Sequence, residues 1–260
     1  MSKKKLGLSL SGGGARGVAH VGFLKALEDG GIKPDVVSGC SIGAVVGGCY
    51  CAGVTLDEMK SCLTRLTKKD LLDVNFNLLN HKSIFAGKKM RSLLQKYVGR
   101  RDIESLDVTY GCIATDLISG SLVNLVDGDL VSAILASASI PTVFAPVERD
   151  GCLLVDGGVL LRNPVKLAKD LGADVIVAVD VLGKLNKTPK VDKIIDVGMR
   201  TFSVIDNVFC SKLGTKMADL VIYPPVRDVK VFNFENLASA YQSGYEEGVS
   251  RIGDIKALIA

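Results

Sequence analysis

Ser41 is the residue whose context in this sequence best suits a nucleophile. It is the centre of Gly39-Cys40-Ser41-Ile42-Gly43, a G-x-S-x-G pattern. Residues 35–37 before the pattern predict a strand, and residues 41–51, which are rich in glycine and alanine, predict a helix. A serine between a strand and a helix, with glycine on both sides, is typical of the tight turn that exposes a reactive hydroxyl at a helix N-terminus.

Asp156 is the best candidate for the base that would accept the proton of Ser41. The usual base is a histidine that follows the acidic residue in the chain, but the two histidines, His20 and His81, both precede Asp156. Asp156 leaves an expected strand and is followed by two glycines. Alone, such a D-G-G sequence indicates only a turn. Within hydrogen-bond reach of Ser41, however, its carboxylate could take the serine proton and later activate water.

A glycine-rich loop forms the third element of the predicted site. Residues 11–17, Ser-Gly-Gly-Gly-Ala-Arg-Gly, follow an expected strand at residues 6–10 and lead into a helix expected from about Gly17 to Leu27. Successive glycines can turn several backbone N–H groups toward one point, and such a cluster suits an oxyanion.

The same loop also has a second interpretation. Gly12, Gly14 and Gly17 spell G-x-G-x-x-G, the pattern of dinucleotide-binding folds. That function requires an acidic residue at the end of the second strand, whereas Asp35 precedes that strand, and the sequence has no G-K-[ST] phosphate-binding pattern. Nucleotide binding is therefore the second hypothesis, and a non-catalytic lipid-binding regulator is the third.

The remaining pattern alternates strands with helices, which predicts an α/β fold. The chain has 260 residues, is 48% hydrophobic and 5% aromatic, and contains 28 glycines, a composition that fits one domain, 1–260, around a buried aliphatic sheet. The expected strands are 6–10, 35–37, 110–115, 121–126, 147–149, 152–155, 174–181 and 220–223. Asp150-Gly151 is a turn signal that predicts a hairpin between 147–149 and 152–155. The expected later helices are 55–66, 88–97, 129–138, 164–171, 194–213 and one that begins near 236. Thr55 and Glu58 have the spacing of a capping box, and Asp129 is the expected cap of the helix that follows it.

Residues 67–101 fit this alternation poorly and are expected to form a lid or a flap that faces the substrate. Polar and apolar residues alternate within parts of this segment, and its apolar side chains together with three lysines could contact a lipid surface or form a small core of their own. The residues concerned are Leu78, Leu79, Lys82, Ile84, Phe85, Lys88 and Lys89.

Charge and cysteine content narrow the function classes. The net charge of +4 comes from scattered basic doublets without interleaved aromatic residues, which argues against a nucleic-acid partner and leaves peripheral contact with anionic membranes open. Seven cysteines without a C-x-x-C pattern suggest reduced thiols and a cytoplasmic location.

No targeting or membrane segment is expected from the sequence. The N-terminus does not have the pattern of a signal peptide, and the uncharged residues 36–56 are expected to form a buried strand, turn and helix rather than a membrane span.

Five motifs in order along residues 5–165 resemble the bacterial patatin-like phospholipase family. Beside the glycine loop, the G-x-S-x-G pattern and Asp156-Gly157-Gly158, they are Ala114-Thr115-Asp116-Leu117 and the stretch 136–141, Ala-Ser-Ala-Ser-Ile-Pro. The resemblance implies a three-layer α/β/α sandwich with a mainly parallel central sheet. Cys40 and Ile42 depart from the threonine or histidine and the alanine that are common in relatives, and both could narrow the turn at Ser41.

The resemblance also implies a mechanism and a substrate class. Ser41 would be the nucleophile and Asp156 the base of an acyl-ester hydrolase. The glycine loop, with Gly12, Gly13, Gly14, Arg16 and Gly17, would form the oxyanion hole. The implied substrate is a phospholipid or another fatty-acyl ester, and the implied chemistry uses no metal and no organic cofactor.

For the other polar residues near these motifs we expect structural roles. His20 should be a hydrogen-bonded core histidine, Cys40 a small buried filler, and Asp116 and Asp180 caps of turns or helices. Arg16 could hold a lipid phosphate or stabilise the glycine loop.

Overall fold

The computed structural model describes residues 3–67, 70, 73, 83–185, 191–192, 194–231 and 237–260. The centre of its sheet is β1 (Leu6–Leu10), which pairs in parallel with β2 (Val36–Gly39) on one side and β7 (Val175–Val179) on the other. All five residues of β1 and of β7 are buried. Their side chains are mostly aliphatic because helices cover both faces of the sheet.

The sheet continues in parallel through β3 (Thr109–Asp116) next to β2 and β8 (Leu220–Ile222) next to β7. Its other margin is antiparallel, with β4 (Leu122–Leu125) and β6 (Cys152–Asp156) on β3, and β5 (Val147–Arg149) on β6. The predicted β5–β6 hairpin is confirmed. Its turn residues, Asp150 and Gly151, both have positive φ angles, 51° and 78°, as a two-residue type I′ turn requires.

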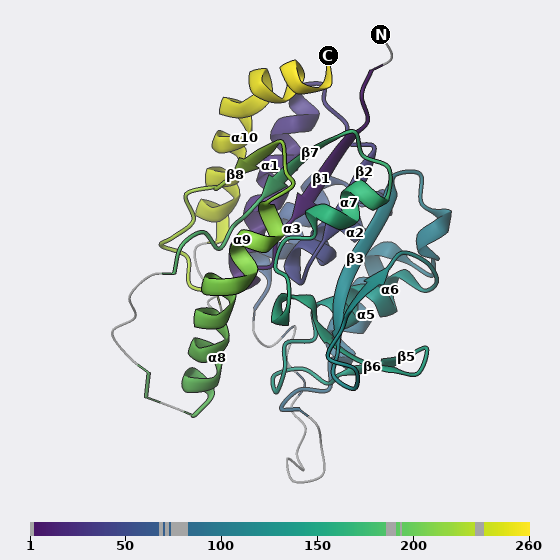
Figure 1. Ribbon diagram of the computed structural model, residues 1–260, viewed down its shortest axis with the longest axis vertical. Helices are drawn as coiled ribbons and strands as arrows, with labels where there is room; N and C mark the ends of the chain where they lie inside the picture. The colour runs from purple at the N-terminus through teal and green to yellow at the C-terminus, as the bar shows by residue number, and fades with distance from the viewer. Residues whose placement is uncertain are drawn as a thin grey trace.

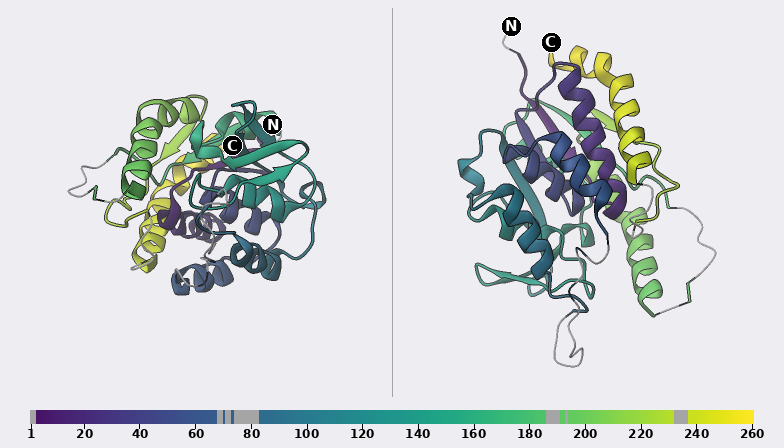
Figure 2. Two further views of the ribbon diagram at one scale, coloured as in Figure 1. Left: turned by 90° about the horizontal axis from the view of Figure 1, so that it is seen from below. Right: turned by 180° about the vertical axis from the view of Figure 1, so that it is seen from behind.

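Helices cover the two faces of this sheet, so the predicted three-layer α/β/α sandwich is confirmed (Figures 1 and 2). The larger core lies between the sheet and one helical layer, and a smaller core lies under α7 on the opposite face. The helices of the first layer are α1 (Val18–Asp29), α2 (Ile42–Cys51), α3 (Leu56–Arg65), α5 (Lys88–Val98), α6 (Leu130–Ser137) and α10 (Leu237–Ile259). The second layer holds α7 (Val165–Asp170), with α8 (Ile194–Ile205) and α9 (Ser211–Thr215) on the same side.

Local sequence signals explain where several of these helices begin. Thr55 and Glu58 form the expected capping box of α3, and Asp129 accepts a hydrogen bond from the backbone N–H of Ser132 at the start of α6. At the start of α1 the glycine loop first makes a 3₁₀ turn, Gly14–Gly17, so the α-helix begins at Val18, one residue later than expected.

The single helix expected at 194–213 is interrupted. Between α8 and α9 the chain forms a π-helical turn, Asp206–Cys210. This widened turn brings Asp206 into the interior, where it pairs with Arg162. Hydropathy alone could not reveal the break, because the pattern of apolar residues continues through the turn.

Part of the predicted flap is attached to the body of the protein. The backbone N–H groups of Ile84 and Phe85 donate to the carbonyls of Thr142 and Val143, and the ring of Phe85 lies 6.0 Å from that of Phe144. Leu78, Leu79, Lys82 and His81 lie outside the described residues. A lid function for residues 67–101 therefore stays a prediction.

Candidate active site

The turn at Ser41 has the strained geometry that its two flanking glycines permit. Ser41 has a φ of 54° and a ψ of −123° and is the N-cap of α2. A Cβ atom on Gly39 would lie 2.5 Å from the carbonyl oxygen of Gly43, and one on Gly43 would lie 2.2 Å from that of Leu10. Both positions therefore exclude any residue with a side chain. The backbone N–H of Ser41 donates to Ser137 Oγ at 3.0 Å, which fixes the turn from the side of α6.

Strand pairing explains how Asp156 reaches Ser41. One edge of β3 is occupied by β4, so β2 and β6 must share the other edge, one after the other. The last residue of β2, Gly39, pairs with Cys112, and the last residue of β6, Asp156, pairs with Ala114. Because β2 runs parallel and β6 antiparallel to β3, their carboxyl ends meet, and Ser41 lies at the junction.

Ser41 and Asp156 are in direct contact. Ser41 Oγ donates a hydrogen bond to Asp156 Oδ2 at 2.5 Å, and the backbone N–H of Gly158 donates to Oδ1 at 2.8 Å. Asp156 is 3% exposed and Ser41 is 9% exposed. Burial raises the pKa of Asp156 to about 6, although the hydrogen bonds from Ser41 and Gly158 lower it. Asp156 is thus ionised at neutral pH, and its pKa suits proton exchange near that pH.

In the glycine loop, two backbone N–H groups are available for a ligand. Gly12 N–H donates to the carbonyl of Arg162 at 2.9 Å, and Ala15 N–H donates to that of Val231 at 2.8 Å. The N–H groups of Gly13 and Gly14 donate to none of the described residues, and both glycines line the same cavity as Ser41. Gly14 has a φ of 55°, and a Cβ there would lie 2.4 Å from the carbonyl oxygen of Val231.

These contacts reduce the set of residues that could donate to an oxyanion in the way expected from the sequence. Gly12 has its N–H engaged, so it shapes the loop. The Arg16 guanidinium donates to the backbone carbonyls of Val229, Leu182 and Arg227, which is the loop-stabilising role considered above. Gly17 gives space to Ile42, whose Cγ1 atom would lie 2.2 Å from a Cβ at this position. Free donors remain only at Gly13 and Gly14 among the described loop residues.

Residues expected to be structural have structural contacts. His20 Nε2 lies 2.9 Å from the carbonyl oxygen of Ser11, and burial lowers the pKa of His20 to about 4, so the ring is neutral. Burial raises the pKa of Cys40, which keeps its thiol protonated and poorly nucleophilic. Asp116 accepts hydrogen bonds from the N–H groups of Ile118 and Ser119 and so caps a turn, as expected.

The geometry weakens the nucleotide-binding alternative. The carboxylate of Asp35 accepts a hydrogen bond from the N–H of Leu6 at 2.8 Å. Leu6 begins β1, whereas the glycine loop follows the other end of that strand. Asp35 is therefore at the wrong end of the sheet to hold a ribose next to this loop.

A buried ion cluster beside Ser41 was not predicted from the sequence. The guanidinium of Arg162 donates to Asp180 at 2.6 Å and to Asp206 at 2.8 Å, and the three side chains are at most 7% exposed. Arg162 Nε and Asp206 Oδ1 have no partner among the described residues, although both residues line the cavity. The only sequence signal is a charged residue between the apolar residues 159–161 and Asn163-Pro164.

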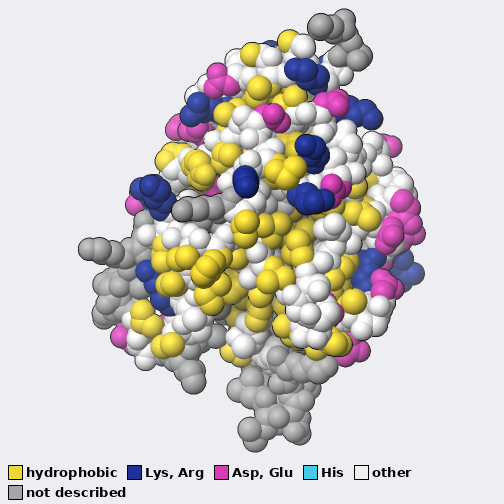
Figure 3. All heavy atoms as spheres, in the orientation of Figure 1, with side chains coloured by type: hydrophobic (Ala, Val, Ile, Leu, Met, Phe, Trp, Pro, Cys, Tyr) yellow, Lys and Arg dark blue, Asp and Glu magenta, His cyan; other side chains and the backbone are white. Residues whose placement is uncertain are grey.

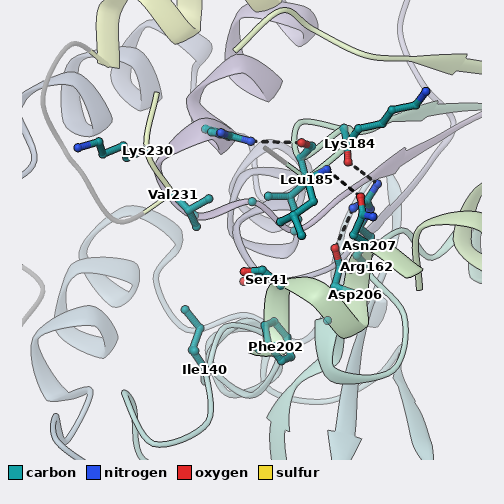
Figure 4. Close-up of a pocket in the computed structure, with 18 of the residues that line it drawn as sticks. Ser41, Ile140, Arg162, Lys184, Leu185, Phe202, Asp206, Asn207, Lys230 and Val231 are labelled. Carbon is teal, nitrogen blue, oxygen red and sulfur yellow. Dashed lines mark hydrogen bonds and ion pairs between the residues drawn. The ribbon is translucent and has the colours of Figure 1, made fainter. Parts of the chain in front are cut away.

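Ser41, Asp156 and the glycine loop open into one cavity of about 440 Å³ (Figure 4). Apolar side chains and cations share its wall, so it can take a molecule with both an apolar chain and an anionic group. Its apolar residues are Ile140, Leu182, Leu185, Phe202 and Val231, and its cations are Arg16, Arg162, Lys184, Arg200, Arg227 and Lys230.

The protein is an α/β protein with a candidate hydrolase site. This class is defined by the three-layer fold, the buried Ser–Asp pair and the neighbouring glycine loop with free N–H groups. Comparison with known proteins identifies the family. The patatin-like phospholipase family model matches residues 8–169, so the chain belongs to this family. The matched range contains the glycine loop, Ser41 and Asp156.

Curated relatives include an uncharacterized NTE family protein of Mycobacterium tuberculosis, 38% identical over 182 residues that make up 70% of this chain and 50% of that protein. Another is "Neuropathy target esterase sws" of Drosophila melanogaster, 32% identical over 70% of this chain and 13% of that protein. "Lysophospholipase NTE1" of Scheffersomyces stipitis is 31% identical over 73% of this chain and 12% of that protein. The chain therefore spans half the length of the mycobacterial relative and much less of the others.

Among solved structures, VipD from Legionella pneumophila superimposes with a TM-score of 0.60 over 97% of this chain and 67% of that one. The sequence identity is 15%, so this likeness supports the fold alone.

Proposed function

We propose that the protein is a serine hydrolase that cleaves carboxylic esters of lipids. The observation that carries this proposal is the 2.5 Å hydrogen bond from Ser41 Oγ to Asp156, in a cavity that is also lined by Gly13 and Gly14, whose N–H groups donate to none of the described residues. Nucleophile, base and oxyanion donors are the three parts that ester hydrolysis by a covalent mechanism needs. Membership of the patatin-like phospholipase family supports the same reaction.

In the first half of the reaction, Ser41 Oγ attacks the ester carbonyl carbon while its proton passes to Asp156. The carbonyl oxygen becomes an oxyanion, which accepts hydrogen bonds from Gly13 and Gly14. Collapse of this intermediate breaks the ester bond, and the leaving alcohol takes the proton from Asp156. The acyl group stays on Ser41 as an ester.

In the second half, a water molecule attacks this acyl-enzyme and gives a proton to Asp156. The second oxyanion forms at the same position as the first. Its collapse releases the fatty acid and returns the proton from Asp156 to Ser41 Oγ. Each step is carried out by the side chains and backbone of this chain.

The cavity wall supports an amphipathic substrate. Ile140 and Phe202 lie near Ser41 in Figure 4 and offer apolar surface to an acyl chain. The exposed cations Lys184, Arg227 and Lys230 would suit a phosphate headgroup. Phospholipase, lysophospholipase and carboxylesterase activities all fit this wall, and the relatives described above include proteins named as an esterase and as a lysophospholipase.

We further propose that the chain acts as one domain in the cytoplasm. All seven cysteines are free, including the two neighbours Cys49 and Cys51, which suits a reducing compartment. No helix among the described residues is long and apolar enough to cross a bilayer.

Hydrolysis of a short p-nitrophenyl ester tests the proposal. The wild-type protein should release p-nitrophenol, and Ser41→Ala should lose this activity while keeping its circular dichroism spectrum and melting temperature. Full activity in the Ser41→Ala protein would refute the assignment. The nucleotide-binding alternative predicts that NAD or ATP raises the melting temperature, and we expect no such shift.

A further inference from the structure

The helical run that carries the π-helical turn has an unusual distribution of apolar side chains. Seven apolar residues of α8, the turn and the segment after it are 42–66% exposed. This apolar stripe consists of Val197, Val204, Ile205, Val208, Phe209, Leu213 and Met217. Figure 3 shows apolar side chains gathered on this face of the molecule, over α8 and α9. A helix on the surface of a globular protein normally points such residues inward.

Among the side chains that the structure describes, several on the inward face of the same run are polar. Ser203, Asp206 and Asn207 line the cavity together with Phe202, and Asp206 is buried against Arg162. The run thus directs several polar side chains toward the active site and several apolar ones toward solvent. This inversion indicates that the apolar stripe is covered when the protein works.

The stripe lies beside the cavity because one helix supplies both. Phe202 and Asp206 of the cavity wall alternate along the run with Val204, Ile205 and Val208 of the stripe. A surface that covered the stripe would therefore meet the protein next to Ser41. For a substrate that resides in a lipid layer, this arrangement would shorten its path to the nucleophile.

Charge indicates which kind of surface fits. Six cationic and three acidic side chains line the cavity, and three of the cations, Lys184, Arg227 and Lys230, are exposed. Lys216 is exposed between Leu213 and Met217 of the stripe. Apolar side chains that enter the acyl region, with cations at headgroup level, match an anionic phospholipid layer.

We propose that the apolar stripe docks on the surface of an anionic phospholipid membrane and places the mouth of the cavity against it. The benefit of docking, access of Ser41 to lipid substrates, rests on the proposed function. The docking itself can be measured without catalysis.

The test is vesicle flotation with a Ser41→Ala protein, so that the lipids stay intact. The vesicles contain phosphatidylcholine with or without phosphatidylglycerol. The variant combines Phe209→Gln and Leu213→Gln, which preserve helix propensity and lie outside the cavity wall. The matched control is Val249→Gln on α10, a position with 50% exposure on a different helix. We expect the double variant to lose at least about tenfold in partition to anionic vesicles and the control to match its parent.

Three results would overturn the inference: equal binding by parent and double variant, equal loss in the Val249→Gln control, or equal binding to vesicles with and without phosphatidylglycerol. A dimer in light scattering that the double variant dissociates would also overturn it and would assign the stripe to a second copy of the chain. When Ser41 is retained, Phe209→Gln and Leu213→Gln should leave hydrolysis of the soluble p-nitrophenyl ester intact. If that hydrolysis is absent from the wild type, the proposed function fails while the flotation result still stands.

Discussion

At the scale of single residues, the proposed chemistry depends on a carboxylate that burial makes a stronger base. Asp156 is almost fully buried, and its two oxygens accept hydrogen bonds from Ser41 and Gly158. In water a carboxylate is too weak a base to activate a serine efficiently. The raised pKa of Asp156 reduces this difference, so in the proposed mechanism an aspartate could serve as the base in place of a downstream histidine, which the sequence lacks.

Ester hydrolysis should depend on pH through Asp156. Only its ionised form can accept the serine proton, so kcat/KM should rise as pH increases from 5 and level off above the pKa of about 6. A pH profile on the soluble ester measures this midpoint. A rate that stays constant between pH 5 and 7.5 would exclude Asp156 as the group that titrates.

Asp156→Asn should lower activity and raise stability at alkaline pH. The loss in kcat should be on the order of 10²-fold or more, because the amide cannot accept the proton. Since the pKa of about 6 in the folded protein exceeds the ordinary value of 3.8, the carboxyl favours folding below about pH 4 and loses this contribution as pH rises through 6.

The Asp156→Asn protein carries no charge at this buried position, so it does not lose stability as pH rises through 6. At pH 8 it should be more stable than the wild type by about 3 kcal/mol, a difference that largely disappears near pH 4. Urea unfolding at the two pH values provides the comparison. A variant that is less stable than the wild type at pH 8 would contradict the account of the buried charge.

Gly14→Ala tests the glycine loop. The added Cβ would meet the carbonyl of Val231 at 2.4 Å and would move the N–H that is expected to hold the oxyanion. We expect kcat on the soluble ester to fall about 10²- to 10³-fold. Gly172→Ala is the control, because its φ of 96° imposes similar strain in open space. If both variants keep full activity, the loop is not the oxyanion hole.

At the scale of elements, the site is made by the ends of strands and the starts of helices. β2 and β6 meet along one edge of β3, and this junction brings together two residues that are 115 positions apart. Arg162 then joins two further elements. Its backbone carbonyl holds Gly12 of the glycine loop, while its guanidinium holds Asp206 in the π-helical turn.

Arg162→Gln should therefore destabilise the protein strongly. The substitution leaves Asp180 and Asp206 buried without their cation, which typically costs about 3–5 kcal/mol. Arg251→Gln is the matched control, because Arg251 also pairs with two acidic residues but on the exposed side of α10, where such pairs contribute less than about 1 kcal/mol. Chemical denaturation of both variants tests this contrast, and equal effects would contradict it.

The sequence predicted the elements better than their junctions. Alternating apolar patterns and turn residues identified the strands, the β5–β6 hairpin and the capped helices, because these features depend on neighbouring residues. The π-helical turn at Asp206 escaped prediction, since it depends on a long-range contact with Arg162. The free donors of the glycine loop could not be separated from the engaged ones, because the partner of Gly12 is 150 positions away.

At the scale of the whole molecule, the family and the fold agree with the motifs. The match to the patatin-like phospholipase family spans the first two thirds of the chain, which contain the proposed nucleophile, base and oxyanion donors. The last third contributes α8, the π-helical turn and α9, and through them part of the cavity wall and the apolar stripe. The proposed catalytic machinery and the surface proposed to meet lipid thus come from different parts of the sequence.

The central claim is that Ser41 becomes covalently acylated with Asp156 as its base. Labelling with a fluorophosphonate probe, followed by mass spectrometry of the peptides, tests it most directly. We expect one modification per chain, at Ser41, that is absent from Ser41→Ala and much slower in Asp156→Asn. A wild-type protein that stays unlabelled, or is labelled at another residue, would contradict the account.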